Sequence, residues 1–179
     1  LTSSGTGAME AAVVNTLSQG ERVLAVTVGN FGDRFSRIAS AYGADVNQLK
    51  FPEGEAADPV AIRQALESDP SITAVLVTHN ETSTGITNDL ETIANIVKGE
   101  FDKLLLVDAI SSLGSIRLPV DEWGLDVVCA GSQKGWMCPP GLSMISFSDR
   151  AWEASKKATM PKFYYDLTEA KNAVVKGQT

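Results

Sequence analysis

Cysteine and histidine are scarce in this sequence, which limits the kinds of site it can build. The two cysteines, Cys129 and Cys138, are too few for a disulfide framework and match no zinc-binding spacing. The single histidine, His79, excludes chemistry that requires two histidines. We therefore expect no metal site, and so few cysteines favour a reducing, cytoplasmic setting.

Long apolar runs and clusters of basic residues are also missing. No stretch approaches the run of about 18 apolar residues that a membrane span needs. The net charge is −7 and the 15 lysines and arginines are scattered, whereas nucleic-acid binding needs clustered cations. The opening LTSSGTGAMEAA has neither the basic start nor the apolar run of a secretory signal. The sequence thus predicts neither a membrane nor a nucleic-acid partner.

Apolar runs alternate regularly with stretches of helical period. The 179 residues, 44% hydrophobic and 21% charged, are typical of one globular domain with a sizeable core. Most apolar runs are continuous, which favours parallel strands covered on both faces. The pattern predicts an α/β fold, a mainly parallel sheet flanked by helices on both faces. The expected strands are 22–28, 44–51, 72–78, 103–109, 126–132 and 142–148, and the expected helices are 8–18, 32–42, 58–68, 88–98 and 149–158.

Polar, glycine-rich segments follow four of the expected strands, and a fifth opens the chain. In parallel α/β sheets, ligands bind at the carboxyl ends of the strands. These five segments therefore predict a ligand site at one edge of the sheet. They are SSGTG (3–7), GNFG (29–32), HNETSTG (79–85), DAISSLG (108–114) and SQKGW (132–136).

The opening SSGTG leads directly into an apolar helix. Small residues and hydroxyls at a helix N-terminus suit an anion, so Ser4, Gly5 and Thr6 are candidate phosphate ligands. The alternative is that the segment is only a turn. Neither GxGxxG nor GxxxxGK[ST] occurs, so a nucleotide-binding α/β domain has no motif in its favour.

Two charged residues stand at the ends of neighbouring expected strands. Asp108 follows four apolar residues and is either a partner for a cationic ligand group or a cap on the next turn. Lys134 follows the strand 126–132 in a glycine-flanked loop and is either a solvated lysine or an amine activated by desolvation. His79 is interpreted as a hydrogen-bonded scaffold residue near the site, and both cysteines as packing residues.

Five segments occur in the order seen in one enzyme family, namely SSGTGAMEAA, GNFGDR, THNETSTG, VDAISSLG and GSQKG. The sequence resembles the class V aminotransferases, in the branch of the alanine–glyoxylate, serine–glyoxylate and serine–pyruvate enzymes. These enzymes are of pyridoxal 5′-phosphate (PLP) fold type I. The similarity runs from residue 3 to about residue 148, and more weakly through 163–167. The spacing from Asp108 to Lys134 is its most specific feature.

The resemblance implies how the cofactor phosphate is held. Ser4, Gly5 and Thr6 would surround the phosphate, and Gln133 would contribute a side-chain donor.

The resemblance also implies contacts to the pyridine ring. Phe31 would pack on one face and Ile110 on the other, and Thr82 would donate near the phenolic oxygen. Asp108 would bind the protonated ring nitrogen and Lys134 would form the internal aldimine. A carboxylate at that nitrogen lets the ring act as an electron sink.

The family pattern sets expectations about the extent of the chain. Residues 1–179 would form a single PLP-binding large domain, without the N-terminal segment and the small C-terminal domain of family members. That C-terminal domain carries the arginine that binds the substrate carboxylate. We therefore expect the chain alone to be inactive, and its full-length parent to be a homodimer.

The expected function is a PLP-dependent transaminase that moves an amino group from alanine or serine to glyoxylate or pyruvate. One alternative is another class V activity, a desulfurase or lyase. A desulfurase needs a cysteine on a mobile loop, and Cys138 lies only four residues after Lys134. The other alternative is a truncated domain that serves as a non-catalytic scaffold.

Overall fold

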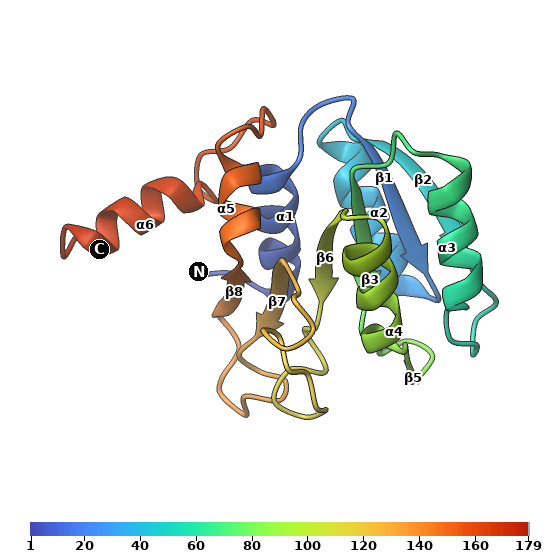
Figure 1. The fold of residues 1–179 in the computed structure, drawn as a ribbon. Helices are drawn as coiled ribbons and strands as arrows, with labels where there is room; N and C mark the ends of the chain where they lie inside the picture. Colours follow the sequence, from blue (N-terminus) through green and yellow to red (C-terminus); the bar gives the residue numbers. More distant parts are fainter. Residues whose placement is uncertain (179) are drawn as a thin grey trace.

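A computed structural model of the chain describes residues 1–178; Thr179, where the predicted domain ends, lies outside the described residues. Its centre is a six-stranded sheet with the order β2-β1-β3-β6-β7-β8 (Figure 1). The strands are β1 (Arg22–Thr27), β2 (Asp45–Lys50), β3 (Ala74–Thr78), β6 (Leu104–Asp108), β7 (Val127–Gly131) and β8 (Ser143–Phe147). A short hairpin of β4 (Asn80–Glu81) and β5 (Ile86–Thr87) follows β3.

The sheet is mainly parallel, as predicted. The strands from β2 to β7 pair in parallel, and β8 alone runs antiparallel to its neighbour β7. The register places Asp108, the last residue of β6, between Thr78 on β3 and Cys129 on β7. The carboxyl ends of β3 and β6 therefore meet at Asp108, beside β7, which ends two residues further on at Gly131.

Helices cover both faces of the sheet (Figure 1). Successive strand residues alternate between two core layers: Leu104 and Leu106 pack in one, and Leu105 and Val107 in the other. The first layer lies beneath α1 (Gly5–Thr16), α2 (Asn30–Ala41) and α5 (Asp149–Ser155). The second lies beneath α3 (Pro59–Ser68), α4 (Leu90–Ala94) and the π-helical η1 (Asn95–Glu100). Continuous apolar strands follow from this double covering.

One helix was not predicted, α6 (Leu167–Val175). Asp166 caps it by accepting from the backbone N–H groups of Thr168 and Glu169 at 2.9 and 3.2 Å. Leu167 is its only buried residue, so the sequence carries little of the apolar periodicity that marks a helix packed on a core.

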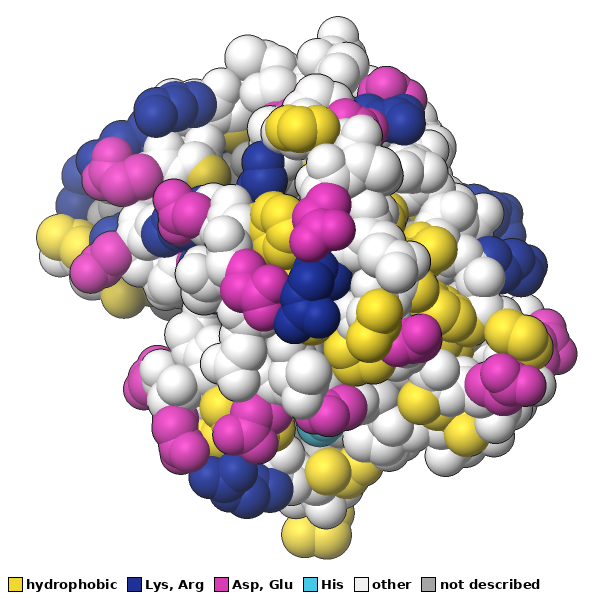
Figure 2. All heavy atoms as spheres, turned by 45° about the vertical axis from the view of Figure 1, so that its right-hand side comes forward, with side chains coloured by type: hydrophobic (Ala, Val, Ile, Leu, Met, Phe, Trp, Pro, Cys, Tyr) yellow, Lys and Arg dark blue, Asp and Glu magenta, His cyan; other side chains and the backbone are white. Residues whose placement is uncertain are grey.

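The helices of residues 1–178 include none that is long and apolar enough to cross a membrane. On the face drawn in Figure 2, basic and acidic side chains are interspersed, and neither sign forms a continuous patch.

Candidate functional site

A cavity of about 220 Å³ opens where α1 begins, beside the carboxyl ends of the parallel strands. The predicted site residues meet here, with two exceptions: Asp108 lies beside the cavity below Ile110, and Thr82 is exposed on the turn after β4. The site also has two lining residues that were not predicted, Met9 and Arg34. The lining residues are Ser4, Gly5, Thr6, Met9, Phe31, Arg34, Ile110, Gln133 and Lys134.

Asp108 is a buried carboxylate with few partners. Its side chain accepts from the Ile110 backbone N–H at 3.0 Å and from the Thr78 hydroxyl at 3.3 Å, and the residue is 3% exposed. It takes part in no ion pair among residues 1–178. Burial raises the pKa of Asp108 to about 6, and the two hydrogen bonds offset only part of that effect. The geometry leaves a place for a cationic partner.

Lys134 reaches the same sheet edge on the loop that follows β7. Glycines bring this loop against the one that follows Asp108: a Cβ on Gly114 would lie 3.2 Å from the Gly135 carbonyl carbon. Gly114 also has a φ of +90°, which favours glycine. The Lys134 side chain is exposed, so contrary to the prediction it is not desolvated, because the close contact between the two loops is made by the backbones of Gly114 and Gly135.

The N-terminus of α1 presents unpaired donors to the cavity. Ser4 is the N-cap, yet its hydroxyl makes no capping hydrogen bond. No backbone carbonyl within residues 1–178 accepts from the N–H groups of Gly5 or Thr6. These amides and hydroxyls, at the positive end of a helix of 12 residues, suit an anion.

Gly5 allows the floor of the cavity to close. A Cβ at Gly5 would lie 2.6 Å from Cδ1 of Ile110, so any side chain would displace that residue. The Gln133 side chain packs next to Ile110, over Gly131. Ile110 thus forms one apolar wall, with a polar side chain at its margin.

Phe31 and Arg34 form another wall, from the first turn of α2. They are three residues apart, on one face of the helix, and the Arg34 guanidinium carbon lies 4.7 Å from the Phe31 ring centroid. Arg34 Nη1 also donates to the Thr6 hydroxyl at 3.1 Å. Sequence reasoning missed Arg34, although the segment GNFGDR contains it one helical turn after Phe31.

His79 is a scaffold residue beside the site, as predicted. Its Nδ1 lies 3.0 Å from the Ser112 hydroxyl, and its backbone N–H donates to the Asp108 carbonyl at 2.8 Å. Burial lowers the pKa of His79, so the ring is neutral at physiological pH. Cys129 is buried in β7, where burial raises the pKa of its thiol, and it packs as predicted. Cys138 is exposed.

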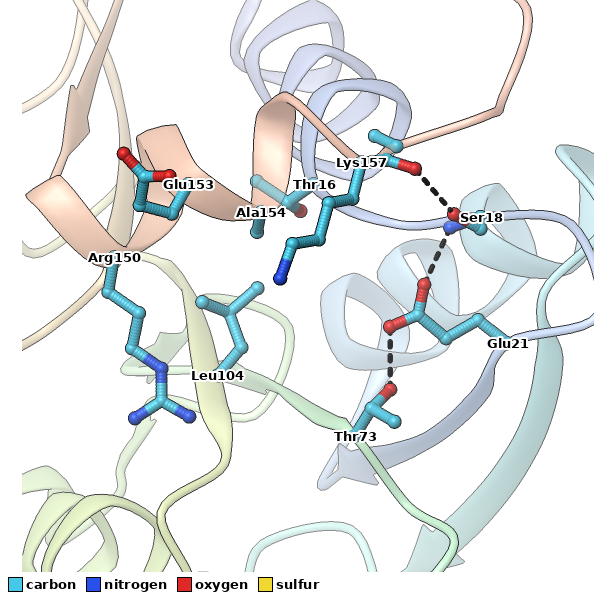
Figure 3. A pocket seen from close by; sticks show the side chains of 10 residues that line it. Thr16, Ser18, Glu21, Thr73, Leu104, Arg150, Glu153, Ala154 and Lys157 are labelled. Carbon is cyan, nitrogen blue, oxygen red and sulfur yellow. Dashed lines mark hydrogen bonds between the residues drawn. The ribbon is translucent and has the colours of Figure 1, made fainter.

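A second hollow, of about 270 Å³, opens at the opposite edge of the sheet, near the amino ends of β1, β3 and β6 (Figure 3). Glu21 accepts there from the Ser18 N–H and the Thr73 hydroxyl, both at 2.7 Å. Arg150 is engaged by Asp102. The charged groups of this second hollow thus largely have hydrogen-bond or ion-pair partners, in contrast to those of the smaller cavity around Lys134.

The cavity at the carboxyl edge fits the chemistry of PLP. In or beside it lie a helix N-terminus with unpaired donors, the apolar side chains of Phe31 and Ile110, a buried carboxylate without an ion-pair partner among residues 1–178, and a lysine. These groups match, in that order, a phosphate, a flat ring, a protonated ring nitrogen and an aldehyde.

Known proteins give independent comparisons. Residues 1–176 match the family described as Aminotransferase class-V. A protein named soluble hydrogenase small subunit, from Synechococcus sp., is 49% identical over the whole chain, which covers 47% of that protein. The L-aspartate–glyoxylate aminotransferase of Paracoccus denitrificans is 39% identical over 93% of the chain and 43% of its own length. A solved alanine–glyoxylate aminotransferase from Nostoc sp. superposes with a TM-score of 0.91 at 36% identity, over 97% of this chain and 46% of that one.

The chain thus spans about half the length of the relatives it matches. Within residues 1–178 no group of three or more His, Cys, Asp or Glu side chains is placed to hold a metal ion. The match covers the site as well as the scaffold, since it extends over residues 1–176. The chain belongs to the class V aminotransferase family, as a mainly parallel α/β domain of PLP fold type I.

Proposed function

We propose that this chain is the PLP-binding domain of a transaminase that transfers an amino group from alanine or serine to glyoxylate or pyruvate. The observation that carries the proposal is Asp108, a buried carboxylate with no ion-pair partner among residues 1–178, beside a cavity that Lys134 lines. Two relatives support the acceptor, since both are named for glyoxylate. Their donors differ, L-aspartate in one and alanine in the other. Cytoplasmic residence and a homodimeric parent remain predictions.

Each proposed role rests on a side chain in or beside the cavity. Bound PLP supplies an electron sink for the substrate α-carbon. Asp108 would hold a proton on the ring nitrogen, and Phe31 and Ile110 would hold the ring between them. Lys134 would hold PLP covalently through Nζ and then move the proton at the substrate Cα.

A visible absorption titration with PLP, followed by borohydride reduction and peptide mapping, tests this function. We expect a visible band, with the reduced adduct on Lys134, because that amine lines the cavity. Lys134→Ala should abolish the band, and the exposed control Lys176→Ala should retain it. No band, or adducts spread over several lysines, would leave the scaffold alternative for this chain.

A second prediction concerns the charge that balances the cofactor phosphate. The phosphate carries nearly two negative charges, whereas Ser4, Gly5, Thr6 and Gln133 are neutral. Arg34 is the one guanidinium that lines the cavity among the described residues. We expect Arg34→Met to weaken PLP binding about tenfold and to leave the affinity for pyridoxal, which has no phosphate, unchanged.

The control is Arg37→Met, because Arg37 lies on the same helix but lines only the adjacent hollow. Both affinities are measured by absorbance titration. An equal loss for PLP and pyridoxal in Arg34→Met would show that Arg34 supports the ring or the fold and does not bind the phosphate.

A further inference from the structure

Glu81 is the most completely enclosed carboxylate near the site. It lies in β4, is 0% exposed, and uses each oxygen for a different segment. Oε2 accepts from the backbone N–H groups of Phe31 and Gly32 at 2.9 and 3.0 Å. Oε1 accepts from the backbone N–H and the hydroxyl of Ser83 at 3.2 and 2.6 Å. One side chain thus joins the first turn of α2 to the turn between β4 and β5.

The buried Glu81 carboxylate is compensated by backbone amides and not by a cation among residues 1–178. Glu81 takes part in no ion pair among residues 1–178. Its carboxylate instead lies at the N-terminus of α2, where unpaired N–H groups and the helix dipole favour a negative charge. An uncompensated buried charge would be strongly unfavourable, so these amides are held tightly in place.

This capping differs from that of α3, α4, α5 and α6. Asp58, Asp89, Ser148 and Asp166 each cap the helix that they directly precede. The N-cap of α2 is Gly29, which has no side chain, and the helix is capped instead by Glu81, 50 positions after Phe31 in the sequence. A remote cap fixes where the helix begins in space, whereas a local cap fixes only where it begins along the chain.

Gly29 shows how closely the start of α2 packs against Glu81 and Ser83. Its φ of 162° is extended backbone that any residue adopts, so the conformation does not require glycine. The lack of space at this position does require glycine, because a Cβ there would lie 2.7 Å from Cγ of Glu81 and 2.6 Å from the Ser83 hydroxyl. The start of α2 is therefore seated against the Glu81 side chain.

The residue directly held by this contact is Phe31, which forms a wall of the cavity. We propose that Glu81 is a positioning residue. It fixes the start of α2 and so holds the Phe31 ring in the wall of the cavity, where the ring would contact the cofactor. This proposal rests on the proposed function, which identifies PLP as the ring that Phe31 would contact. Glu81 itself does not line the cavity and acts through Phe31.

The first experiment follows Phe31 without any cofactor, by ¹⁹F NMR of the 179-residue protein labelled with 4-fluorophenylalanine. The six phenylalanines give few resonances, and Phe31→Leu identifies the one from Phe31. We expect Glu81→Met, which keeps the side-chain length but removes both acceptors, to move that resonance towards its unfolded position. Glu81→Gln should leave it nearly in place, because one oxygen can still accept from Phe31 and Gly32.

Two further variants complete this experiment. Asp58→Ala removes the local cap of α3, far from the cavity, and should not move the Phe31 resonance. Should Glu81→Met fail to fold, Gly29→Ala displaces the same contact and should shift the same resonance. A Phe31 resonance that stays in place in a folded Glu81→Met protein would overturn the proposal.

The second experiment measures PLP affinity in a double-mutant cycle. We expect Glu81→Met to weaken binding about tenfold, and to have little further effect once Phe31 is replaced by leucine. Glu81→Gln should recover most of the affinity. Additive losses would overturn the route through Phe31. A wild-type protein that binds no PLP but whose Phe31 resonance still responds to Glu81→Met would refute the proposed function and leave the positioning role intact.

Discussion

Replacing Asp108 by asparagine is expected to stabilise the free protein by about 3 kcal/mol at about pH 8, and at the same time to weaken its binding of PLP. Burial raises the pKa of the Asp108 carboxyl to about 6, from an ordinary value of 3.8. The difference between these two pKa values corresponds to about 3 kcal/mol, at about 1.4 kcal/mol for each tenfold change in proton affinity. An asparagine can accept from Ile110 and donate to the Thr78 hydroxyl, so it keeps both neighbours without the buried charge.

The stability gain depends on pH in a defined direction. The folded chain retains the Asp108 proton up to about pH 6, whereas the unfolded chain releases it near pH 4. The wild-type protein therefore loses stability as the pH rises through this window, and Asp108→Asn does not. The two proteins should be about equally stable below about pH 4 and differ most above about pH 7.

Urea unfolding across this pH range measures the difference. Asp121→Asn, at an exposed position, is the control and should follow the wild-type profile. The affinity for PLP should change in the opposite direction to the stability. Asp108→Asn should weaken PLP binding, because a protonated ring nitrogen would compensate the Asp108 carboxylate but not an asparagine. An asparagine variant less stable than the wild type at about pH 8 would mean that the carboxylate is already compensated in the free protein.

The fold was largely predictable because its strands are covered on both faces. Residues 104–107 are all apolar, and each faces one of two core layers, so the continuous run identifies a buried parallel strand. The same reasoning could not give the direction of β8, because apolar content carries no information on strand polarity. It also missed α6, which buries only Leu167.

The site was predictable where one segment carries its own signal. Asp108 and Lys134 each follow an apolar strand, and the sheet topology brings β6 and β7 side by side. Glu81 carries no such signal, since its partners Phe31 and Gly32 are 50 and 49 positions away. Thr82 and Lys134 were expected at the cavity and both are exposed, although only Lys134 lines it. Exposure depends on packing between distant loops, which a single segment does not encode.

Asp126 is a second buried aspartate, and its loss is expected to have the opposite effect from that of Asp108. It is 2% exposed and has three partners: the Lys98 ammonium at 2.5 Å, the Leu105 backbone N–H at 2.9 Å and the Ser148 hydroxyl at 2.9 Å. Ser148 is also the N-cap of α5. One carboxylate thus joins η1, β6 and α5 near the amino ends of the strands.

Asp126→Ala should lower the free energy of unfolding by about 3 to 4 kcal/mol, since it leaves the mostly buried Lys98 ammonium and the Leu105 N–H without their acceptor. Glu122→Ala removes a partner from the Arg117 pair, whose side chains are 65% and 62% exposed, and should cost no more than about 0.5 kcal/mol. Urea unfolding of both variants near neutral pH makes the comparison. A loss below about 1 kcal/mol for Asp126→Ala would mean that desolvation of the pair cancels its attraction. A large loss, alongside a gain for Asp108→Asn, would show that the buried carboxylate of Asp126 stabilises the amino edge of this sheet, while that of Asp108, at the carboxyl edge, is held at a cost that a cationic ligand relieves.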